Sequence, residues 1–294
     1  MMEKKIISVV GATGYQGKGV VQALVQDGTY RVRAITRNPD KYSGNADEVA
    51  KADLTDLASL TQSFKGSHGV FVVTNFWEGA DEKAQGKIAI QAAKDAGVNH
   101  FIWSTLPDVE KISNGKFNVP HFTGKAQVDE LVKESGFENY TFVQPPFYFQ
   151  NFTGQLAAQE QQDGSMGWTL PLNPSKKVIH MADINDLGKV VAGAFINPEK
   201  VGNGSYLSLA TELNSFNDVL AAFKENGKEF KFNQVPADVF SGFFDGAGEL
   251  AQMFAFFEEY TYMGGNADDR IQLAKEVATE EFISLNDWIN KNVS

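Results

Sequence analysis

Short apolar runs alternate with segments of helical periodicity through the first half of the chain. Runs such as Val70-Phe71-Val72-Val73 are continuously apolar, which is typical of parallel strands covered by helices on both faces. The runs predict strands over 5–10, 31–36, 49–52, 69–74, 99–104 and 140–144. The periodic segments between them predict helices over 15–27, 56–65, 81–97 and 120–135.

Glycine and proline mark the ends of these helices. Gly28, Gly97 and Gly136 each follow a predicted helix and precede a predicted strand, and glycine is the usual residue just beyond a helix. Pro120 falls in the first turn of the helix over 120–135, where its missing N–H does no harm. The pattern predicts an α/β fold with a Rossmann-type, doubly wound parallel sheet and a nucleotide site at the carboxyl ends of the strands.

The pattern changes after Pro145-Pro146. A helix is expected near 148–161, followed by a stretch punctuated by glycine and proline over 163–175. A short strand then runs into His180–Asp183, and Asp183 is expected to cap a helix over 184–196. Farther on, the pattern predicts strands over 204–210 and 229–234 and helices over 214–226, 236–263 and 282–292.

Length and composition fit this organisation. A chain of 294 residues can hold one large domain or two modest ones. We expect residues 1–150 to form a nucleotide-binding domain and residues 151–294 to form a smaller α+β lobe packed over the strand ends. One or two elements of that lobe have room to return to the main sheet.

The charge balance and the cysteine count disfavour several classes of function. The formal net charge is −11, and the largest basic cluster is the pair Lys176–Lys177, so direct nucleic-acid binding is disfavoured. The chain has no cysteine, and its four histidines lack the spacing of metal ligands. The early first strand leaves no room for a signal peptide, and no apolar run could span a bilayer. We therefore expect a cytoplasmic or nuclear protein with no metal and no membrane partner.

The most informative segment joins the first strand to the first helix. Residues 6–17 read IISVVGATGYQG, with glycines at Gly11, Gly14 and Gly17. Glycines there allow a tight turn, close approach of backbone N–H groups to a phosphate, and close packing of the helix on the strand. The segment predicts a pyrophosphate site, although its G-x-x-G-x-x-G spacing differs from the usual G-x-G-x-x-G.

Two cations follow the second predicted strand. A site for NAD(H) normally has an acidic residue there to bind the ribose 2′-hydroxyl, but this chain has Arg37, with Lys41 one turn later. Arg37 could bind a 2′-phosphate through its fork and Lys41 as a point charge, which favours NADP(H). The alternative is that Arg37 is a solvated loop residue, partly offset by Asp40.

Asp53 ends the third predicted strand, where a carboxylate can accept a hydrogen bond from an adenine amino group. Asp53 could equally begin the following helix. In that alternative Thr55 competes with it for the cap position.

Several motifs together resemble the NmrA-like branch of the short-chain dehydrogenase/reductase superfamily, over nearly the whole chain. They are Gly11-Ala-Thr-Gly-Tyr-Gln-Gly17, Thr36-Arg-Asn-Pro39, Thr74-Asn-Phe-Trp77, His121-Phe-Thr-Gly-Lys125 and Pro146-Phe-Tyr-Phe-Gln-Asn151. The resemblance is closest to NADPH-sensor type NmrA-like proteins. It implies a Rossmann domain with a small C-terminal lobe, and regulation of protein partners, including GATA-type transcription factors, in response to the nicotinamide redox state.

The resemblance also implies where NADP(H) binds, and Ser104 joins that site because it ends the fifth predicted strand. The expected cofactor residues are Gly11, Ala12, Thr13, Gly14, Tyr15, Gln16, Gly17, Arg37, Lys41, Asp53, Leu54, Thr74, Asn75, Phe76, Trp77, Ser104, Lys125, Pro146, Tyr148, Phe149, Gln150 and Asn151.

The catalytic pair of typical short-chain dehydrogenases is altered. Those enzymes use Tyr-x-x-x-Lys on one helix face, but this chain has His121 and Lys125 at the two positions. Histidine does not simply replace the phenol, because a free imidazole is largely deprotonated at neutral pH. Lys125 could act as a general base, as in isoflavone-reductase-like enzymes, and Ser104 and Thr105 could orient a carbonyl. Alternatively, His121 lines the cofactor pocket and the two hydroxyls only satisfy backbone groups.

Aromatic residues crowd one stretch of the C-terminal lobe. Most are expected in its core, and the alternative is an apolar cleft or a docking face. Glu249, Glu258 and Glu259 would give such a face an acidic rim for a basic partner. The aromatic residues are Phe240, Phe243, Phe244, Phe254, Phe256, Phe257, Tyr260 and Tyr262.

These observations predict an NADP(H)-binding regulatory protein, a redox sensor with little or no dehydrogenase activity. The rival hypothesis is an NADPH-dependent reductase of quinone-like or other unsaturated small molecules, with Lys125 in the chemistry. A third is a scaffold without a cofactor, against which the intact glycines and Arg37 argue. Monomer and homodimer both stay open.

Overall fold

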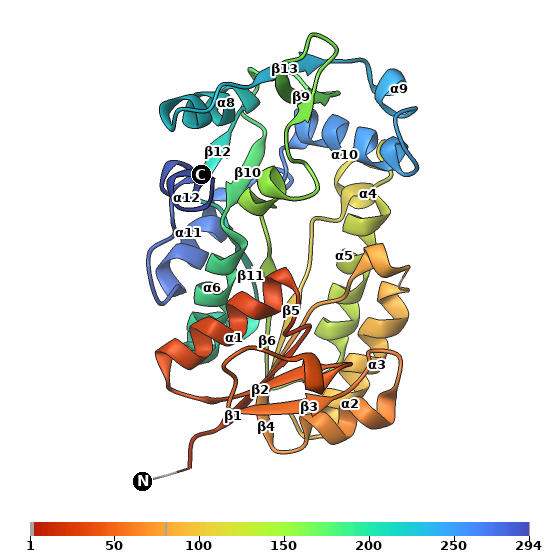
Figure 1. Cartoon of the computed structure of the whole chain (residues 1–294). Helices are drawn as coiled ribbons and strands as arrows, with labels where there is room; N and C mark the ends of the chain where they lie inside the picture. The colour runs from red at the N-terminus through yellow and green to blue at the C-terminus, as the bar shows by residue number, and fades with distance from the viewer. Residues whose placement is uncertain (1–2, 80, 294) are drawn as a thin grey trace.

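A computed structural model describes residues 3–79 and 81–293, and its centre is a seven-stranded, all-parallel sheet (Figure 1). The strand order is β11-β6-β5-β4-β1-β2-β3. The chain moves outward in one direction through β2 and β3 and in the other through β4, β5 and β6, so the switch point lies between β1 and β4. The strands are β1 (Ile6–Val10), β2 (Arg31–Thr36), β3 (Glu48–Lys51), β4 (Ser67–Val72), β5 (His100–Ser104), β6 (Asn139–Gln144) and β11 (Asn203–Ser208).

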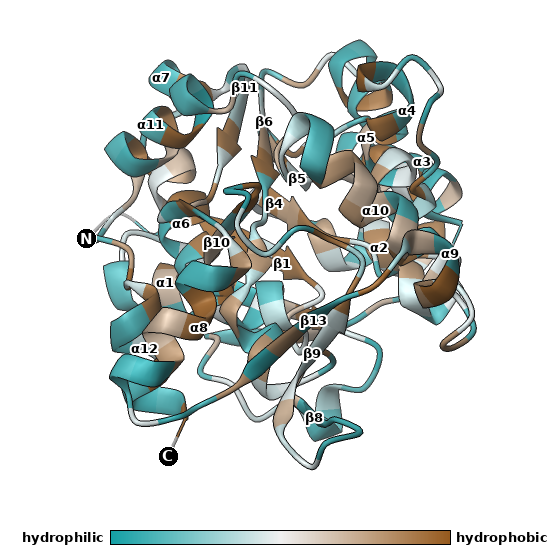
Figure 2. Cartoon of the chain, turned by 90° about the horizontal axis from the view of Figure 1, so that it is seen from above, coloured by the Kyte–Doolittle hydropathy of each residue, from teal (hydrophilic) through white to brown (hydrophobic). Residues whose placement is uncertain are grey.

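Helices cover both faces of this sheet, as the doubly wound prediction requires (Figure 1). Each face has its own apolar core, and the central strands β1 and β4 that separate the cores are strongly hydrophobic (Figure 2). One face carries α1 (Tyr15–Asp27), α6 (Leu187–Ile196) and α11 (Asp268–Val277), and the other carries α2 (Leu57–Phe64), α3 (Glu82–Asp95) and α5 (Pro120–Glu134). The predicted fold class is confirmed.

Glycines bring the helices of the first face unusually close together. A Cβ atom at Gly188 of α6 would lie 2.1 Å from the carbonyl oxygen of Gly19 in α1. A Cβ atom at Gly193 would lie 1.7 Å from the carbonyl oxygen of Val277 in α11. These contacts leave no space for a side chain, so α6 is held tightly between α1 and α11.

The second half of the chain builds a smaller lobe above the strand ends (Figure 1). Its two small sheets are β12-β10-β7 and β13-β9-β8. Their strands are β7 (Phe147–Tyr148), β8 (Gln159–Glu160), β9 (Met166–Leu170), β10 (Ile179–Ala182), β12 (Glu212–Asn214) and β13 (Lys231–Gln234). The remaining helices are α4 (Val109–Ile112), α7 (Pro198–Val201), α8 (Phe216–Glu225), α9 (Ala237–Phe240), α10 (Ala247–Tyr260) and α12 (Leu285–Asn292), with short 3-10 helices η1 (Pro39–Lys41), η2 (Phe76–Glu78), η3 (Phe149–Thr153) and η4 (Ile184–Asp186).

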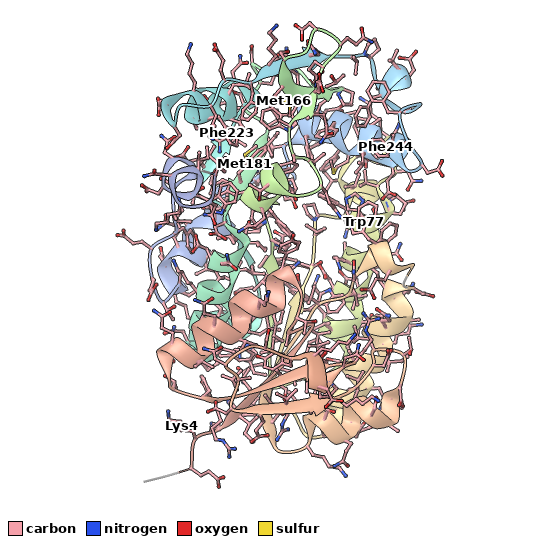
Figure 3. The ribbon with its side chains drawn as sticks, in the orientation of Figure 1. Lys4, Trp77, Met166, Met181, Phe223 and Phe244 are labelled. Atoms are coloured by element: carbon pink, nitrogen blue, oxygen red, sulfur yellow. The ribbon has the colours of Figure 1, made fainter. Side chains whose placement is uncertain are left out.

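Most of the aromatic residues singled out in the lobe are core residues, as expected. Phe240, Phe254, Phe256, Phe257 and Tyr262 are buried. Phe243 and Phe244 each keep about half of their surface exposed, and Tyr260 is half-buried. Phe244 lies at the outer edge of the lobe beside α9 and α10 (Figure 3).

The predicted elements of the first half are confirmed to within two residues at each end. Pro120 begins α5, and glycines with positive φ follow α1, α3 and α5. Asp183 caps the start of η4, which leads into α6, by accepting a hydrogen bond from the Asn185 N–H.

Three predictions for the second half were wrong or incomplete. The helix near 148–161 does not form, because Phe147 and Tyr148 pair with β10 and the segment continues as η3 and β8. The helix over 236–263 is two helices, α9 and α10, separated by a turn that ends at Gly246 with φ of 90°. Helix α11 and strands β9 and β12 had no counterpart in the sequence prediction.

The described part of the chain contains neither a membrane-spanning helix nor a cluster of metal ligands. Within 3–79 and 81–293, none of the helices combines the length and the apolar character needed to cross a bilayer. The same residues contain no group of three or more His, Cys, Asp or Glu side chains arranged to hold a metal ion.

Candidate functional site

The glycine turn after β1 lies at the switch point of the main sheet. Gly11 has φ of 73°, and its carbonyl oxygen accepts a hydrogen bond from the Gly14 N–H at 2.9 Å. A Cβ atom at Gly17 would lie 2.1 Å from that carbonyl oxygen. Gly14 caps α1 without a side-chain hydrogen bond, and the first turn of α1 contains no acidic residue. The first N–H groups of a helix have no partner within it, so this turn fits an anionic group such as a pyrophosphate.

Three of the predicted site residues meet beside this turn. The Gln16 side chain donates to the Tyr148 hydroxyl at 2.9 Å and accepts from the Ser104 hydroxyl at 2.6 Å. Burial raises the pKa of Tyr148 to about 12, against the hydrogen bond from Gln16, so the phenol keeps its proton at neutral pH. The network ties α1, β5 and the segment after β6 together at the strand ends.

Arg37 follows β2 and meets a carboxylate from a distant segment. Its Nη1 lies 2.9 Å from Oε2 of Glu78, and its Nη2 donates to Oε1 of the same residue at 3.2 Å. Glu78 ends η2, which follows β4, and both partners are largely exposed. Lys41 ends η1, one turn beyond Arg37. The fork expected to bind a 2′-phosphate is therefore engaged by a carboxylate of the same chain.

Asp53 lies at the end of β3 but does not cap the next helix. Its carboxylate accepts from the backbone N–H and the hydroxyl of Thr55 at 2.8 and 2.6 Å, and these bonds lower its pKa. The cap of α2 is Asp56, which accepts from Ala58 and Ser59. The alternative that Asp53 or Thr55 begins this helix was wrong. Asp53 and Thr55 form a separate tight turn, and the cap is the next residue, Asp56.

Lys125 of α5 is buried against β4 and the start of α3. Its Nζ donates to Oε1 of Glu82 at 2.6 Å and to the carbonyl oxygen and hydroxyl of Thr74 at 2.8 and 2.9 Å. All three ammonium protons therefore have acceptors. Burial lowers the pKa of Lys125, and the Glu82 carboxylate opposes that shift. The second carboxylate oxygen of Glu82 has no hydrogen-bond partner among the described residues.

His121 lies one turn before Lys125 on α5 and contacts both halves of the molecule. Its Nδ1 lies 2.6 Å from Oε1 of Glu249, which also accepts from the His121 backbone N–H at 3.0 Å. Burial raises the pKa of Glu249, but the bonds from His121 outweigh that effect and lower it. The rings of Trp77 and Phe76 lie 5.1 and 5.9 Å from the imidazole. His121 thus joins η2 to the first turn of α10.

Phe149, Gln150 and Asn151 make their contacts with residues of the second half of the chain. Phe149 is fully buried and packs against Trp288 of α12. The Gln150 side chain donates to Asp183 at 2.6 Å and accepts from the backbone N–H of Ile184. The carbonyl oxygen of Asn151 accepts from Gly154 and Leu156 within the loop. Pro146 is buried, Leu54 is half-buried, and Ala12 and Thr13 lie in the glycine turn.

The expected acidic rim of the lobe is not formed by free carboxylates. Glu249 is bound to His121, and Glu259 is bound to Lys116. Glu258 accepts from the backbone N–H of Asn173 and from Lys176. Each of the three carboxylates is engaged by a side chain of the same chain, so this face is a weaker match for a basic partner than the sequence suggested.

Sequence reasoning missed the carboxylates that partner the site's cations. Glu82 and Glu78 were not singled out, and Glu249 was not assigned to His121. Glu82 occupies the first turn of a helix behind the Asp81 cap, where an acidic residue is ordinarily explained by the helix dipole. Glu82 is buried, with 4% of its surface exposed, because α3 packs against α5. The sequence around Glu82 gives no signal of that contact.

Solved structures share this fold over almost the whole chain. NmrA, a negative transcriptional regulator solved in complex with NADP, aligns with a TM-score of 0.80 at 24% identity, covering 99% of this chain and 96% of NmrA. An NADPH-dependent quinone oxidoreductase from Escherichia coli, solved with NADPH, aligns with a TM-score of 0.77 at 20% identity, covering 98% and 100%. At these identities the likeness establishes the fold.

Sequence comparison also finds relatives that align over most of this chain. An NmrA-like family domain-containing oxidoreductase from Cladobotryum is 31% identical over 256 residues, covering 78% of this chain and 76% of that protein. An NmrA-like family domain-containing protein from Dictyostelium discoideum is 28% identical over 298 residues, covering 96% and 97%. The model of the NmrA-like family matches residues 3–289. The chain is therefore a member of the NmrA-like family.

Proposed function

We propose that the protein binds NADP(H) and acts chiefly as a nucleotide-responsive regulator of a protein partner, with little dehydrogenase activity of its own. The glycine turn and the start of α1 would hold the pyrophosphate, and Arg37 and Lys41 would hold the 2′-phosphate. Asp53 and Leu54 would face the adenine. The NADP and NADPH bound to NmrA and to the E. coli oxidoreductase support this choice of cofactor.

The contacts of Lys125 carry the regulatory part of the proposal. A general base needs an electron pair directed at the substrate. Although burial lowers the pKa of Lys125, its Nζ donates to Glu82 at 2.6 Å and to both oxygens of Thr74, so its hydrogen bonds are made within the chain. Bound nicotinamide would supply hydride chemistry. Lys125, the residue best placed to assist that chemistry as a base, instead holds α3, the end of β4 and α5 together.

The nature of the partner is drawn from the family. NmrA is described as a negative transcriptional regulator, which supports a transcription factor, such as a GATA-type factor, as the partner. The redox-sensor hypothesis follows from the same analogy. It requires that the bound nucleotide changes a surface that the partner contacts.

A second candidate is an NADPH-dependent reductase of a quinone-like or other unsaturated small molecule. The pairing of His121 with Glu249 favours the reductase. Glu249 holds Nδ1 at 2.6 Å, so Nε2, on the other side of the ring, is the atom that would transfer a proton. The oxidoreductase names of the curated relatives also favour it.

Two measurements separate these candidates. NADPH and NADH are first titrated into the full chain by nucleotide fluorescence, with Arg37→Gln as the variant. We expect that variant to lose affinity for NADPH, by about ten-fold, and to keep its affinity for NADH. No binding of NADPH by the wild type would overturn the cofactor assignment.

NADPH consumption is then followed against a panel of quinones and carbonyl compounds. Binding without turnover supports the regulator. Turnover that is lost in His121→Asn and slowed in Glu249→Gln establishes the reductase and overturns the regulatory proposal. Turnover lost in the double variant Glu82→Gln/Lys125→Met, which leaves no unpaired buried charge, but not in His121→Asn would assign the proton transfer to the lysine.

A further inference from the structure

We propose that Glu78 competes with the 2′-phosphate for Arg37. Binding of the phosphate displaces Glu78 and shifts η2, and Trp77, His121 and Glu249 transmit this shift to the C-terminal lobe. This inference rests on the proposed binding of NADP(H). It adds a specificity-determining residue outside the expected cofactor residues, and a route by which the nucleotide reaches the lobe.

The competition follows from the geometry at Arg37. Both terminal nitrogens of the guanidinium face Glu78, at 2.9 and 3.2 Å from its two oxygens. This two-point geometry is also the one in which arginine binds phosphate. A phosphate dianion on the same fork would meet the carboxylate as a like charge, so one of the two anions must leave.

Glu78 is well placed to move. Helix η2 spans three residues, none of which is buried, and it ends at Gly79 with φ of 74°. Besides Arg37, the Glu78 carboxylate accepts a hydrogen bond from Asn75 at 3.1 Å. Asn75 in turn accepts from the Trp77 N–H at 3.2 Å. Because these bonds lie within one short turn, displacement of Glu78 also changes the position of Trp77.

Trp77 carries the change toward the lobe. Its ring lies 5.1 Å from the His121 ring, and His121 makes two hydrogen bonds to Glu249 in the first turn of α10. In Figure 3, Trp77 lies between the main sheet and α10. Contacts therefore run without interruption from the Arg37 fork to the lobe. A shift of η2 by the phosphate is thermodynamically linked to the packing of α10.

NADH and NADPH should have different effects on η2 and on the contacts that lead from it to α10. NADH lacks the 2′-phosphate, so it can occupy the glycine turn while Arg37 stays paired with Glu78. NADPH must displace Glu78 and so pays the cost of breaking that pair. Exposed ion pairs contribute little, which sets the expected effect of removing Glu78 at about two- to five-fold in affinity.

The test uses the full chain and Glu78→Gln, with Glu276→Gln as the matched control. Glu276 also forms an exposed ion pair, with Lys200 at 2.7 Å, on α11. We expect Glu78→Gln to bind NADPH about two- to five-fold more tightly than the wild type and NADH equally well. The control should match the wild type with both nucleotides.

Hydrogen exchange of the wild type completes the test. NADPH, but not NADH at equal saturation, should change exchange in the first turn of α10. If the wild type binds NADPH while Glu78→Gln shows no gain in affinity, the competition is overturned. If exchange in α10 responds equally to both nucleotides, the relay is overturned. A wild type that binds neither nucleotide would instead contradict the proposed function itself.

Discussion

Lys125 and Glu82 form an ion pair whose two side chains are 8% and 2% exposed. Taking two charges out of water is costly, and each charge is tolerated because the other is 2.6 Å away. Arg37 with Glu78 and His121 with Glu249 repeat the arrangement closer to solvent. At the residue scale, Lys125, Arg37 and His121 are therefore each paired with a carboxylate from a different element.

Breaking the buried pair should destabilise the protein strongly. We expect Lys125→Met to lower the free energy of unfolding by about 3–5 kcal/mol, because the Glu82 carboxylate would stay buried without its partner. The double variant Glu82→Gln/Lys125→Met should recover much of that loss. Urea unfolding of the wild type, both single variants and the double variant measures the coupling. A double variant as unstable as Lys125→Met alone would contradict the pairing.

A pH effect is expected from Asp129 of α5. Burial raises the pKa of its carboxyl to about 7, although the Tyr206 hydroxyl donates to it at 2.9 Å. The folded protein thus keeps a proton that the unfolded chain releases near pH 4, so this group's contribution to stability is lost as pH rises from about 4 to about 7.

Asp129→Asn should remove that pH dependence. Its stability relative to the wild type should rise by about 1 kcal/mol per pH unit between roughly pH 5 and pH 7 and level off above pH 8. Urea unfolding at each pH gives the profile, with the exposed Asp245→Asn as the control. A difference that stays flat across this range would show that Asp129 titrates normally.

At the element scale, α6 depends on glycine for its place between α1 and α11. Gly188→Ala would put a methyl group 2.1 Å from a carbonyl oxygen of α1. The two helices must separate, and we expect a loss of about 1–3 kcal/mol. The matched control is Gly248→Ala, another helical glycine, whose Cβ would find its nearest neighbour at 4.0 Å.

The control should be neutral or stabilising by up to about 1 kcal/mol, because alanine favours a helix over glycine. Thermal and urea unfolding compare the two variants. Equal stability of Gly188→Ala and the wild type would mean that α1 and α6 are less closely packed than described.

The sequence predicted what local patterns encode and missed what distant contacts decide. Helix α1 was predicted at its observed ends because its apolar spacing and Gly28 act within one segment. The segment after Pro146 was wrongly predicted as a helix, since pairing of Phe147 and Tyr148 with β10 overrides local preference. In the same way, Arg37 follows from its place after β2, whereas its contact with Glu78 joins residues 41 apart.

At the scale of the whole molecule, the two halves of the sequence share one sheet. Strand β11 pairs with β6, and α6 packs on the face that carries α1. A fragment of residues 1–150 would lack both elements. It would expose the edge of β6 and the apolar side chains that Val191 and Phe195 normally cover.

We therefore expect the 1–150 fragment to fail as an independent unit. It should show no cooperative unfolding by circular dichroism and no NADPH binding, whereas the full chain should melt in a single transition. A fragment that melts cooperatively and binds NADPH would instead support an autonomous nucleotide-binding domain.

The outer strand at the other end of the sheet has a consequence for self-association. An unpaired strand edge is a template onto which another polypeptide can add and start an aggregate. Here β3 spans four residues, and its Glu48 is held by Arg31 and Arg33 of the neighbouring strand at 2.6 and 2.7 Å. A short strand with such ion pairs is a poor template. We therefore do not expect copies of this chain to associate by strand addition at β3.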